Sequence, residues 1–171
     1  KIRMTQENAV KKRIFSFDLD MTLLDHKTWE VPPSAMEALE HIRKDSVIVI
    51  ASGRNMDHEM SSMYCDIIKP DGVIHMNGTR VVAGGNVLFE HLMDKDRLRS
   101  LLSYADEHGY SMGISTGGYD YYIHPEGVTR MDEIRWGVSE RNYRDGWELM
   151  ELPVRTLAYI GGPQGAKEME E

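Results

Sequence analysis

The interpretation of this sequence depends on one stretch, Ile14-Phe15-Ser16-Phe17-Asp18-Leu19-Asp20-Met21-Thr22-Leu23-Leu24. Its first four residues form an apolar run with aromatic side chains, which is typical of a buried strand. Asp18 and Asp20 follow two positions apart, so extended backbone would send both carboxylates to the same side. The stretch therefore predicts a strand that ends in a polar edge carrying two acidic groups.

Two more apolar runs follow, and helical patterns separate them. The expected strands are 47–51, which ends in Ser52-Gly53-Arg54, and 72–76, which ends in the turn pair Asn77-Gly78. The expected helices are 35–43, which a proline opens, and 55–64, with Met56, Met60 and Met63 on its core face. Strands that alternate with helices in this way predict right-handed crossovers and a parallel sheet.

The pattern changes after Gly78. The expected elements there are a hairpin over 80–89, a helix over 94–108, a hairpin over 110–124, a strand over 155–160 and a helix from Pro163. The chain is thus interpreted as α/β, with a Rossmann-like parallel sheet core in residues 1–82 and an α+β domain in residues 83–171.

Composition excludes several classes of protein. The 171 residues include 20 basic and 28 acidic ones, a net charge of 20 − 28 = −8, which argues against binding nucleic acid or an anionic membrane through bulk charge. No apolar run approaches the ~18 residues that span a bilayer. Cys65 is the single cysteine, so a reducing, cytoplasmic location is expected.

Polar side chains end the first two strands at one edge of the predicted sheet. Asp18 and Asp20 can act as nucleophile and general acid/base beside a divalent ion, and Ser52 can donate its hydroxyl to an anionic oxygen. Open α/β sheets bind ligands at this carboxyl edge. The alternative is that the two aspartates only turn the chain after a strand.

Two segments resemble motifs of the haloacid dehalogenase superfamily. Residues 17–24 resemble its motif I, residues 50–54 resemble its motif II, and residues 74–81 resemble the segment that leads to the cap in Cof-type phosphatases. The resemblance implies that Asp18 forms an aspartyl-phosphate and that Asp20 exchanges protons with the leaving group and with water. Met21 stands where the family usually has glycine.

The resemblance also implies a cofactor and a set of binding residues. Mg²⁺ would bind Asp18 and the backbone carbonyl of Asp20. The phosphate-binding set is Asp18, Thr22, Ser52 and Gly53, and the candidate substrate-binding residues are Arg54, Asn77 and Gly78. The expected partner is a small phosphorylated metabolite of the sugar phosphate or nucleotide class, and the oligomeric state stays open.

The family completes its site with a lysine and an acidic pair after the cap, and neither is recognisable in this sequence. We therefore expect these residues to belong to a longer chain. Two other interpretations stay open: a phosphate- or metal-binding relic without turnover, and a phosphotransferase that passes the phosphoryl group to a sugar.

Aromatic and basic residues gather in the predicted cap: Tyr119, Tyr121, Tyr122, His124, Arg130, Arg135 and Trp136. In a capped phosphatase such residues can contact the leaving group. Alternation along a half-buried sheet accounts equally for several of the tyrosines.

Overall fold

The structure is a computed structural model that describes residues 13–116 and 118–170. The chain divides into two compact units, one up to Glu90 and one from His91 onward. The sequence places the boundary between residues 82 and 83. The structural division comes later because the hairpin that follows Gly78 adds two strands to the sheet of the first unit.

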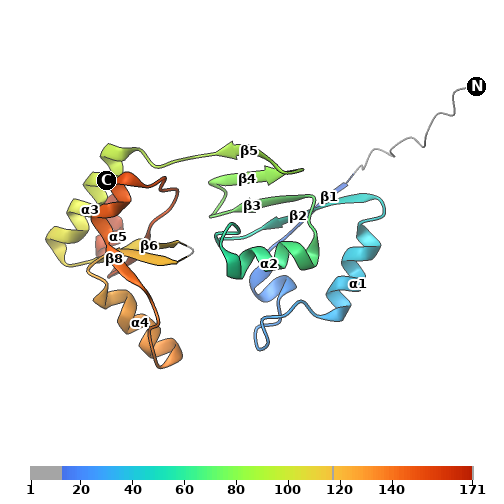
Figure 1. Cartoon of the computed structure of the whole chain (residues 1–171), viewed down its shortest axis with the longest axis horizontal. Coiled ribbons are helices and arrows are strands. Elements are labelled where there is room, and N and C mark those ends of the chain that lie inside the picture. Colours follow the sequence, from blue (N-terminus) through green and yellow to red (C-terminus); the bar gives the residue numbers. More distant parts are fainter. Residues whose placement is uncertain (1–12, 117, 171) are drawn as a thin grey trace, which may run out of the picture. The chain divides into compact units, whose positions relative to one another are not determined.

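The first unit is a five-stranded sheet with two helices (Figure 1). Its strands are β1 (Arg13–Phe17), β2 (Ser46–Ala51), β3 (Gly72–His75), β4 (Arg80–Ala83) and β5 (Asn86–Glu90), in the spatial order β1-β2-β3-β4-β5. Strands β1, β2 and β3 are parallel, and β4 and β5 are antiparallel additions. The α/β class and the parallel core that the sequence predicts are confirmed.

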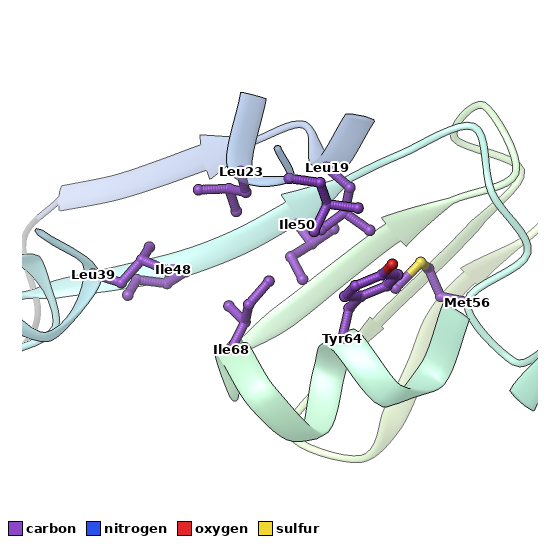
Figure 2. Close-up of a cluster of buried hydrophobic side chains, with 9 residues drawn as sticks. Leu19, Leu23, Leu39, Ile48, Ile50, Met56, Tyr64 and Ile68 are labelled. Carbon is purple, nitrogen blue, oxygen red and sulfur yellow. The ribbon is translucent and has the colours of Figure 1, made fainter. Parts of the chain in front are cut away.

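The core of this unit lies between the sheet and helices α1 (Pro33–Ile42) and α2 (Glu59–Ile68), which both lie below the strands in Figure 1. Ile48 and Ile50 alternate along β2 and are fully buried. Leu39 of α1 and Ile68 of α2 belong to the same cluster (Figure 2). The alternating residues on one face of β2 therefore pack in the same cluster as the buried residues of the two helices.

Strand β1 forms where the apolar run predicts a strand, and among the described residues it is an edge of the sheet. Its partner strand is β2, and Ile14 is 72% exposed. The apolar run does form a strand, but a strand at a sheet edge has one uncovered side.

Helix α2 begins at Glu59, later than the predicted start at residue 55. The His58 side chain caps it by accepting a hydrogen bond from the Met60 amide at 3.2 Å. Met56 lies before the helix and is buried, whereas Met60 is 72% exposed and Met63 is exposed. The expectation that the three methionines share a core face is wrong for Met60 and Met63.

The second unit is a four-stranded sheet with helices. Its strands are β6 (Ser111–Thr116), β7 (Tyr119–Ile123), β8 (Tyr143–Asp145) and β9 (Ala158–Ile160), in the order β8-β7-β6-β9. Its helices are α3 (Lys95–His108), α4 (Glu126–Trp136), α5 (Pro163–Glu170) and the short 3₁₀ helix η2 (Gly146–Glu151). The sequence did not predict α4, β8 or η2. Within the described ranges, no helix is long and apolar enough to cross a membrane.

Helix α3 has the ends that the sequence predicts. The Asp94 side chain caps its first turn by accepting hydrogen bonds from the amides of Asp96 and Arg97 at 2.9 and 3.0 Å. Gly109 ends it with a left-handed φ of 67°. The buried face of the helix packs on Met112 and Ile123 of the sheet.

Candidate active site

The predicted polar residues of the first unit meet at the carboxyl ends of the parallel strands. In the strand register Phe17 lies opposite Ile50, and Ala51 lies opposite Ile74. Asp18 and Ser52, which directly follow these strands, are therefore at the same edge of the sheet. Open α/β sheets bind ligands at such an edge.

Asp18 and Asp20 directly follow β1, and neither side chain is buried. The backbone is extended at Asp18 (φ −75°, ψ 158°) and at Asp20 (φ −67°, ψ 126°). Leu19, which lies between them, is fully buried, whereas Asp18 is exposed and Asp20 is half-buried. Among the described residues, none makes a hydrogen bond or an ion pair to the Asp18 carboxylate. The Asp18 oxygens are therefore open to an incoming group.

Met21 occupies a tight turn, η1 (Leu19–Leu23), that follows β1. Its φ is 58° and its ψ is 14°, in the left-handed region. Left-handed backbone costs a residue with a Cβ roughly 1–2 kcal/mol, and glycine tolerates it. This is a physical reason for a glycine at the position. Thr22 lies in the same turn and is exposed.

We expect Met21→Gly to leave the first unit as stable as before or up to about 1 kcal/mol more stable. The Met21 side chain is 81% exposed, so its removal costs little burial while the backbone strain is relieved. Hydrogen exchange of the β2 amides measures the effect. Met21→Ala is the matched control, because it removes the same side chain but keeps the Cβ and the strain. A Met21→Gly protein that is less stable than Met21→Ala would contradict the argument.

The loop after β2 is tied to the end of β3. The Ser52 amide donates to the Ile74 carbonyl at 2.9 Å, and the Met76 amide donates to the Arg54 carbonyl at 3.1 Å. Ser52 is buried, and its Oγ accepts a hydrogen bond from the Arg54 amide at 3.2 Å. The hydroxyl hydrogen of Ser52 is thus left to donate elsewhere.

Gly53 and Asn77 face one another across this loop. A Cβ added to Gly53 would lie 3.0 Å from Oδ1 of Asn77, which is tighter than most contacts in proteins. Met76, Asn77 and Gly78 have left-handed φ values of 50°, 56° and 85°. The predicted residues Gly53, Asn77 and Gly78 therefore lie together at the carboxyl edge, and their binding of substrate stays a prediction.

Arg54 donates hydrogen bonds to both carboxylate oxygens of Asp20. Its Nε donates to Oδ2 at 2.9 Å, and its NH2 group donates to Oδ1 at 2.6 Å. This fork is the geometry in which arginine binds carboxylates most strongly. The hydrogen bond to Asp20 raises the pKa of the Arg54 guanidinium, and the charge of Asp18 raises it further. In this structure the Arg54 side chain, a candidate substrate-binding group, is engaged by Asp20.

Two aromatic rings that the sequence analysis did not single out contact the same guanidinium. The Cζ atom of Arg54 lies 5.7 Å from the ring centroid of Trp29 and 5.6 Å from that of Tyr64. The Tyr64 hydroxyl also donates to the Trp29 carbonyl at 2.8 Å. Tyr64 comes from α2 and Trp29 from the segment 25–30, so only the folded chain brings them together.

The segment 25–30 is a closed loop, which we call the flap. The amide of Asp25 donates to the carbonyl of Glu30, and the amide of Trp29 donates to the carbonyl of Asp25, both at 2.9 Å. The Asp25 carboxylate accepts hydrogen bonds from the amides of Lys27 and Thr28, and these bonds lower the pKa of Asp25. The flap is therefore an ordered loop whose backbone polar groups are largely paired.

The oxygen donors at the carboxyl edge fit Mg²⁺ in part. Within residues 13–116 and 118–170, no group of three or more histidine, cysteine, aspartate or glutamate side chains has the geometry to hold a metal ion. Mg²⁺ is usually held by one or two protein carboxylates and completed by waters and substrate phosphate. The exposed Asp18 carboxylate and the backbone carbonyl of Asp20 meet this smaller requirement.

The structure distributes the aromatic and basic residues of the second unit over different surroundings. Tyr119 stacks under Arg144, whose Cζ is 4.4 Å from the ring centroid, and Tyr121 packs edge-on to Tyr119. Tyr122 is buried, His124 pairs with Asp106 at 3.1 Å, and Trp136 is exposed. The surroundings of these residues therefore range from the buried core to open solvent.

A buried ion pair organises this unit. The Asp132 side chain is 2% exposed and accepts hydrogen bonds from Nε and NH2 of Arg141 at 2.5 and 3.0 Å. Ser139 donates to the same carboxylate at 3.0 Å. Arg141 also reaches Asp120 of β7 at 3.1 Å, so the pair joins α4, β7 and the segment after α4.

The three parallel strands of a mixed α/β sheet thus carry two aspartates, a serine and an arginine at their carboxyl edge. The sequence matches the family described as haloacid dehalogenase-like hydrolase over residues 15–160. The match covers more than half of the chain, so the protein belongs to this family. A search of curated proteins finds no significant match.

Several solved structures have a similar fold. One is a sugar phosphatase of haloacid dehalogenase subclass IIB, with 22% identity, a TM-score of 0.73 and coverage of 92% of this chain and 62% of that chain. A phosphatase from Bacteroides thetaiotaomicron is 18% identical, with a TM-score of 0.79 and coverage of 98% and 63%. A protein from Thermotoga maritima is 19% identical, with a TM-score of 0.65 and coverage of 92% and 59%.

These likenesses confirm the fold, and the family match over residues 15–160 confirms the superfamily that the sequence motifs indicate. The chain spans 62% and 63% of the lengths of the first two of these structures. At identities below 25%, these structures show a shared fold and do not establish the activity or the substrate of this chain.

Proposed function

We propose that this chain carries the nucleophile and the acid/base of a Mg²⁺-dependent phosphatase that hydrolyses small phosphomonoesters. The observation that supports this proposal most directly is the contrast between the two aspartates. Asp18 is exposed and open, whereas Asp20 is gripped by Arg54 at the same edge. A nucleophile needs access, and a proton carrier needs a fixed orientation.

In the first step an oxygen of Asp18 attacks phosphorus, and the bond from phosphorus to the leaving oxygen breaks. Asp20 gives its proton to that leaving oxygen, so an alcohol departs and an aspartyl-phosphate remains. Arg54 hydrogen bonds occupy one lone pair on each Asp20 oxygen, and each oxygen keeps a second one. Each Asp20 oxygen therefore keeps a lone pair through which it can exchange a proton with the leaving oxygen or with water.

In the second step Asp20 takes a proton from water, and the resulting hydroxide attacks phosphorus. The bond between phosphorus and the Asp18 oxygen breaks, which restores the carboxylate and releases inorganic phosphate. Ser52 would donate its free hydroxyl hydrogen to a phosphoryl oxygen in both steps. Donors aimed at oxygens that gain charge are a large part of such catalysis.

Asp18 and the carbonyl of Asp20 would hold Mg²⁺. When bound, the ion would offset the negative charges of the nucleophile and the phosphoryl group. The chain has a net charge of −8, so we propose that anionic substrates are drawn in by this local set of donors and by the ion. A small sugar phosphate or nucleotide is the proposed partner, and the single cysteine suits a reducing compartment such as the cytoplasm.

Phosphate release from a panel of sugar phosphates, nucleotides and p-nitrophenyl phosphate tests this proposal. We expect release with Mg²⁺ and at least a tenfold lower rate, on the order of the contribution of a metal, after EDTA treatment. Release that EDTA does not affect would contradict the metal assignment. A chain that binds Mg²⁺ but turns over none of the panel would favour the relic, and phosphate found on an added acceptor alcohol would favour the phosphotransferase.

A further inference from the structure

Trp29 has an unusual position for a large aromatic residue. Its φ is 57°, in the left-handed region, and its side chain is 51% exposed. A bulky residue with positive φ is strained and persists only where its surroundings hold it. The small burial of Trp29 does not account for this strain, so its contacts in the site need an explanation.

The backbone contacts of Trp29 hold its ring beside the Arg54 guanidinium. The Trp29 amide is bonded to Asp25 within the flap, and its carbonyl accepts the Tyr64 hydroxyl at 2.8 Å. Tyr64 is 6% exposed, so this anchor belongs to the core (Figure 2). With its backbone held at both ends, Trp29 places its ring 5.7 Å from the Arg54 guanidinium carbon.

Besides its two hydrogen bonds to Asp20, the Arg54 guanidinium contacts the rings of Trp29 and Tyr64. The arginine side chain has many rotamers, and holding it in one of them costs conformational entropy. The rings of Trp29 and Tyr64 are both within the ~6 Å at which a guanidinium is attracted to an aromatic face. These two contacts favour the rotamer in which the fork of Arg54 meets Asp20.

We propose that Trp29 is a positioning residue: together with Tyr64 it confines Arg54, and Arg54 in turn fixes the carboxylate of Asp20. This inference rests on the proposed function for the role of Asp20 as the proton carrier. It links the flap to the site through a contact chain from Asp25 to Trp29, Arg54 and Asp20. Trp29 acts through Arg54 and does not itself touch the reacting atoms.

The exchange rate of the Arg54 Nε–H hydrogen, measured by NMR on the ¹⁵N-labelled full chain, tests the proposal without any need for activity. Arg54→Lys identifies the signal. We expect Trp29→Ala to speed this exchange about fivefold to tenfold, as the loss of one cation–π contact implies. Trp29→Phe keeps an aromatic face and should stay within about twofold of the wild type. Trp136→Ala, which removes an exposed tryptophan of the second unit, should leave the exchange rate of the Arg54 Nε–H hydrogen unchanged.

Kinetics give the second readout. For a substrate found in the phosphatase panel, Trp29→Ala should lower kcat by about the same factor and leave KM unchanged, with rescue by Trp29→Phe. Unchanged Arg54 exchange in a folded Trp29→Ala protein overturns the proposal. If Trp29→Ala does not fold, Tyr64→Phe decides, because it removes only the bond to the Trp29 carbonyl and should also speed the exchange. A wild-type chain without turnover bears on the proposed function alone, since the exchange rates still decide this inference.

Discussion

Asp18→Asn should abolish phosphate release and leave the fold intact. The amide cannot attack phosphorus, so we expect a loss of at least about 10⁴-fold in kcat. The fold should survive because Asp18 is exposed and, among the described residues, has no hydrogen bond or ion pair to lose. Burst and steady-state phosphate release measure the loss.

Trapping of the intermediate makes this prediction specific for the nucleophile. An acyl phosphate is stable to acid quenching and is cleaved by hydroxylamine, so labelled protein should form from a labelled phosphodonor in the wild type and not in Asp18→Asn. Asp66→Asn is the matched control, because it removes an exposed carboxylate of helix α2 in the same unit. Label that persists in Asp18→Asn would place the nucleophile at another residue.

Local sequence signals indicated the positions of Asp18, Asp20 and Ser52, but they did not indicate the aromatic residues that contact Arg54. Asp18, Asp20 and Ser52 lie where strands end, and strand ends are marked by a break in the apolar pattern. The register of parallel strands then brings them together without further information. Trp29 and Tyr64 meet Arg54 through contacts between segments distant in sequence, and no periodicity in the sequence indicates such contacts.

The error in helix α2 has a local cause. The spacing of the methionines predicts a helix from residue 55, but Asn55 and His58 use their side chains to form a turn and a cap. The Asn55 side chain accepts the Asp57 amide at 3.1 Å, and the buried His75 accepts the Met56 amide at 3.2 Å. These bonds compete with helix formation and delay the start of α2.

The sequence did not predict helix α4 because one of its two buried residues, Asp132, is charged. Val128 and Asp132 are its buried residues, one helical turn apart. In a sequence pattern, an aspartate at that position indicates a residue that faces solvent. Its burial costs little free energy only because Arg141, from the segment after the helix, forms an ion pair with it. A pattern of apolar residues cannot indicate a helix whose core contact is an ion pair.

This ion pair leads to a large expected effect on stability. Asp132→Asn should destabilise the second unit by about 3 kcal/mol, because Arg141 would lose its buried carboxylate partner. Hydrogen exchange of the amides in α4 and β7 should then rise about a hundredfold, and the amides of β2 in the first unit should not change. Glu133→Gln is the matched control: it removes the adjacent, exposed charge of the same helix.

The pH dependence of the free energy of unfolding distinguishes the contribution of the Asp132 charge from that of its packing. The hydrogen bond from Arg141, with that from Ser139, lowers the pKa of Asp132 in the folded chain. Ionised Asp132 therefore stabilises the fold fully above the unfolded pKa of about 3.9, and the contribution is lost as pH falls through the lower folded pKa. The stability gap between wild type and Asp132→Asn should be constant near neutral pH and should close below about pH 4. A gap that persists at low pH would mean that Asp132 acts through packing, and that the charge of the pair contributes little.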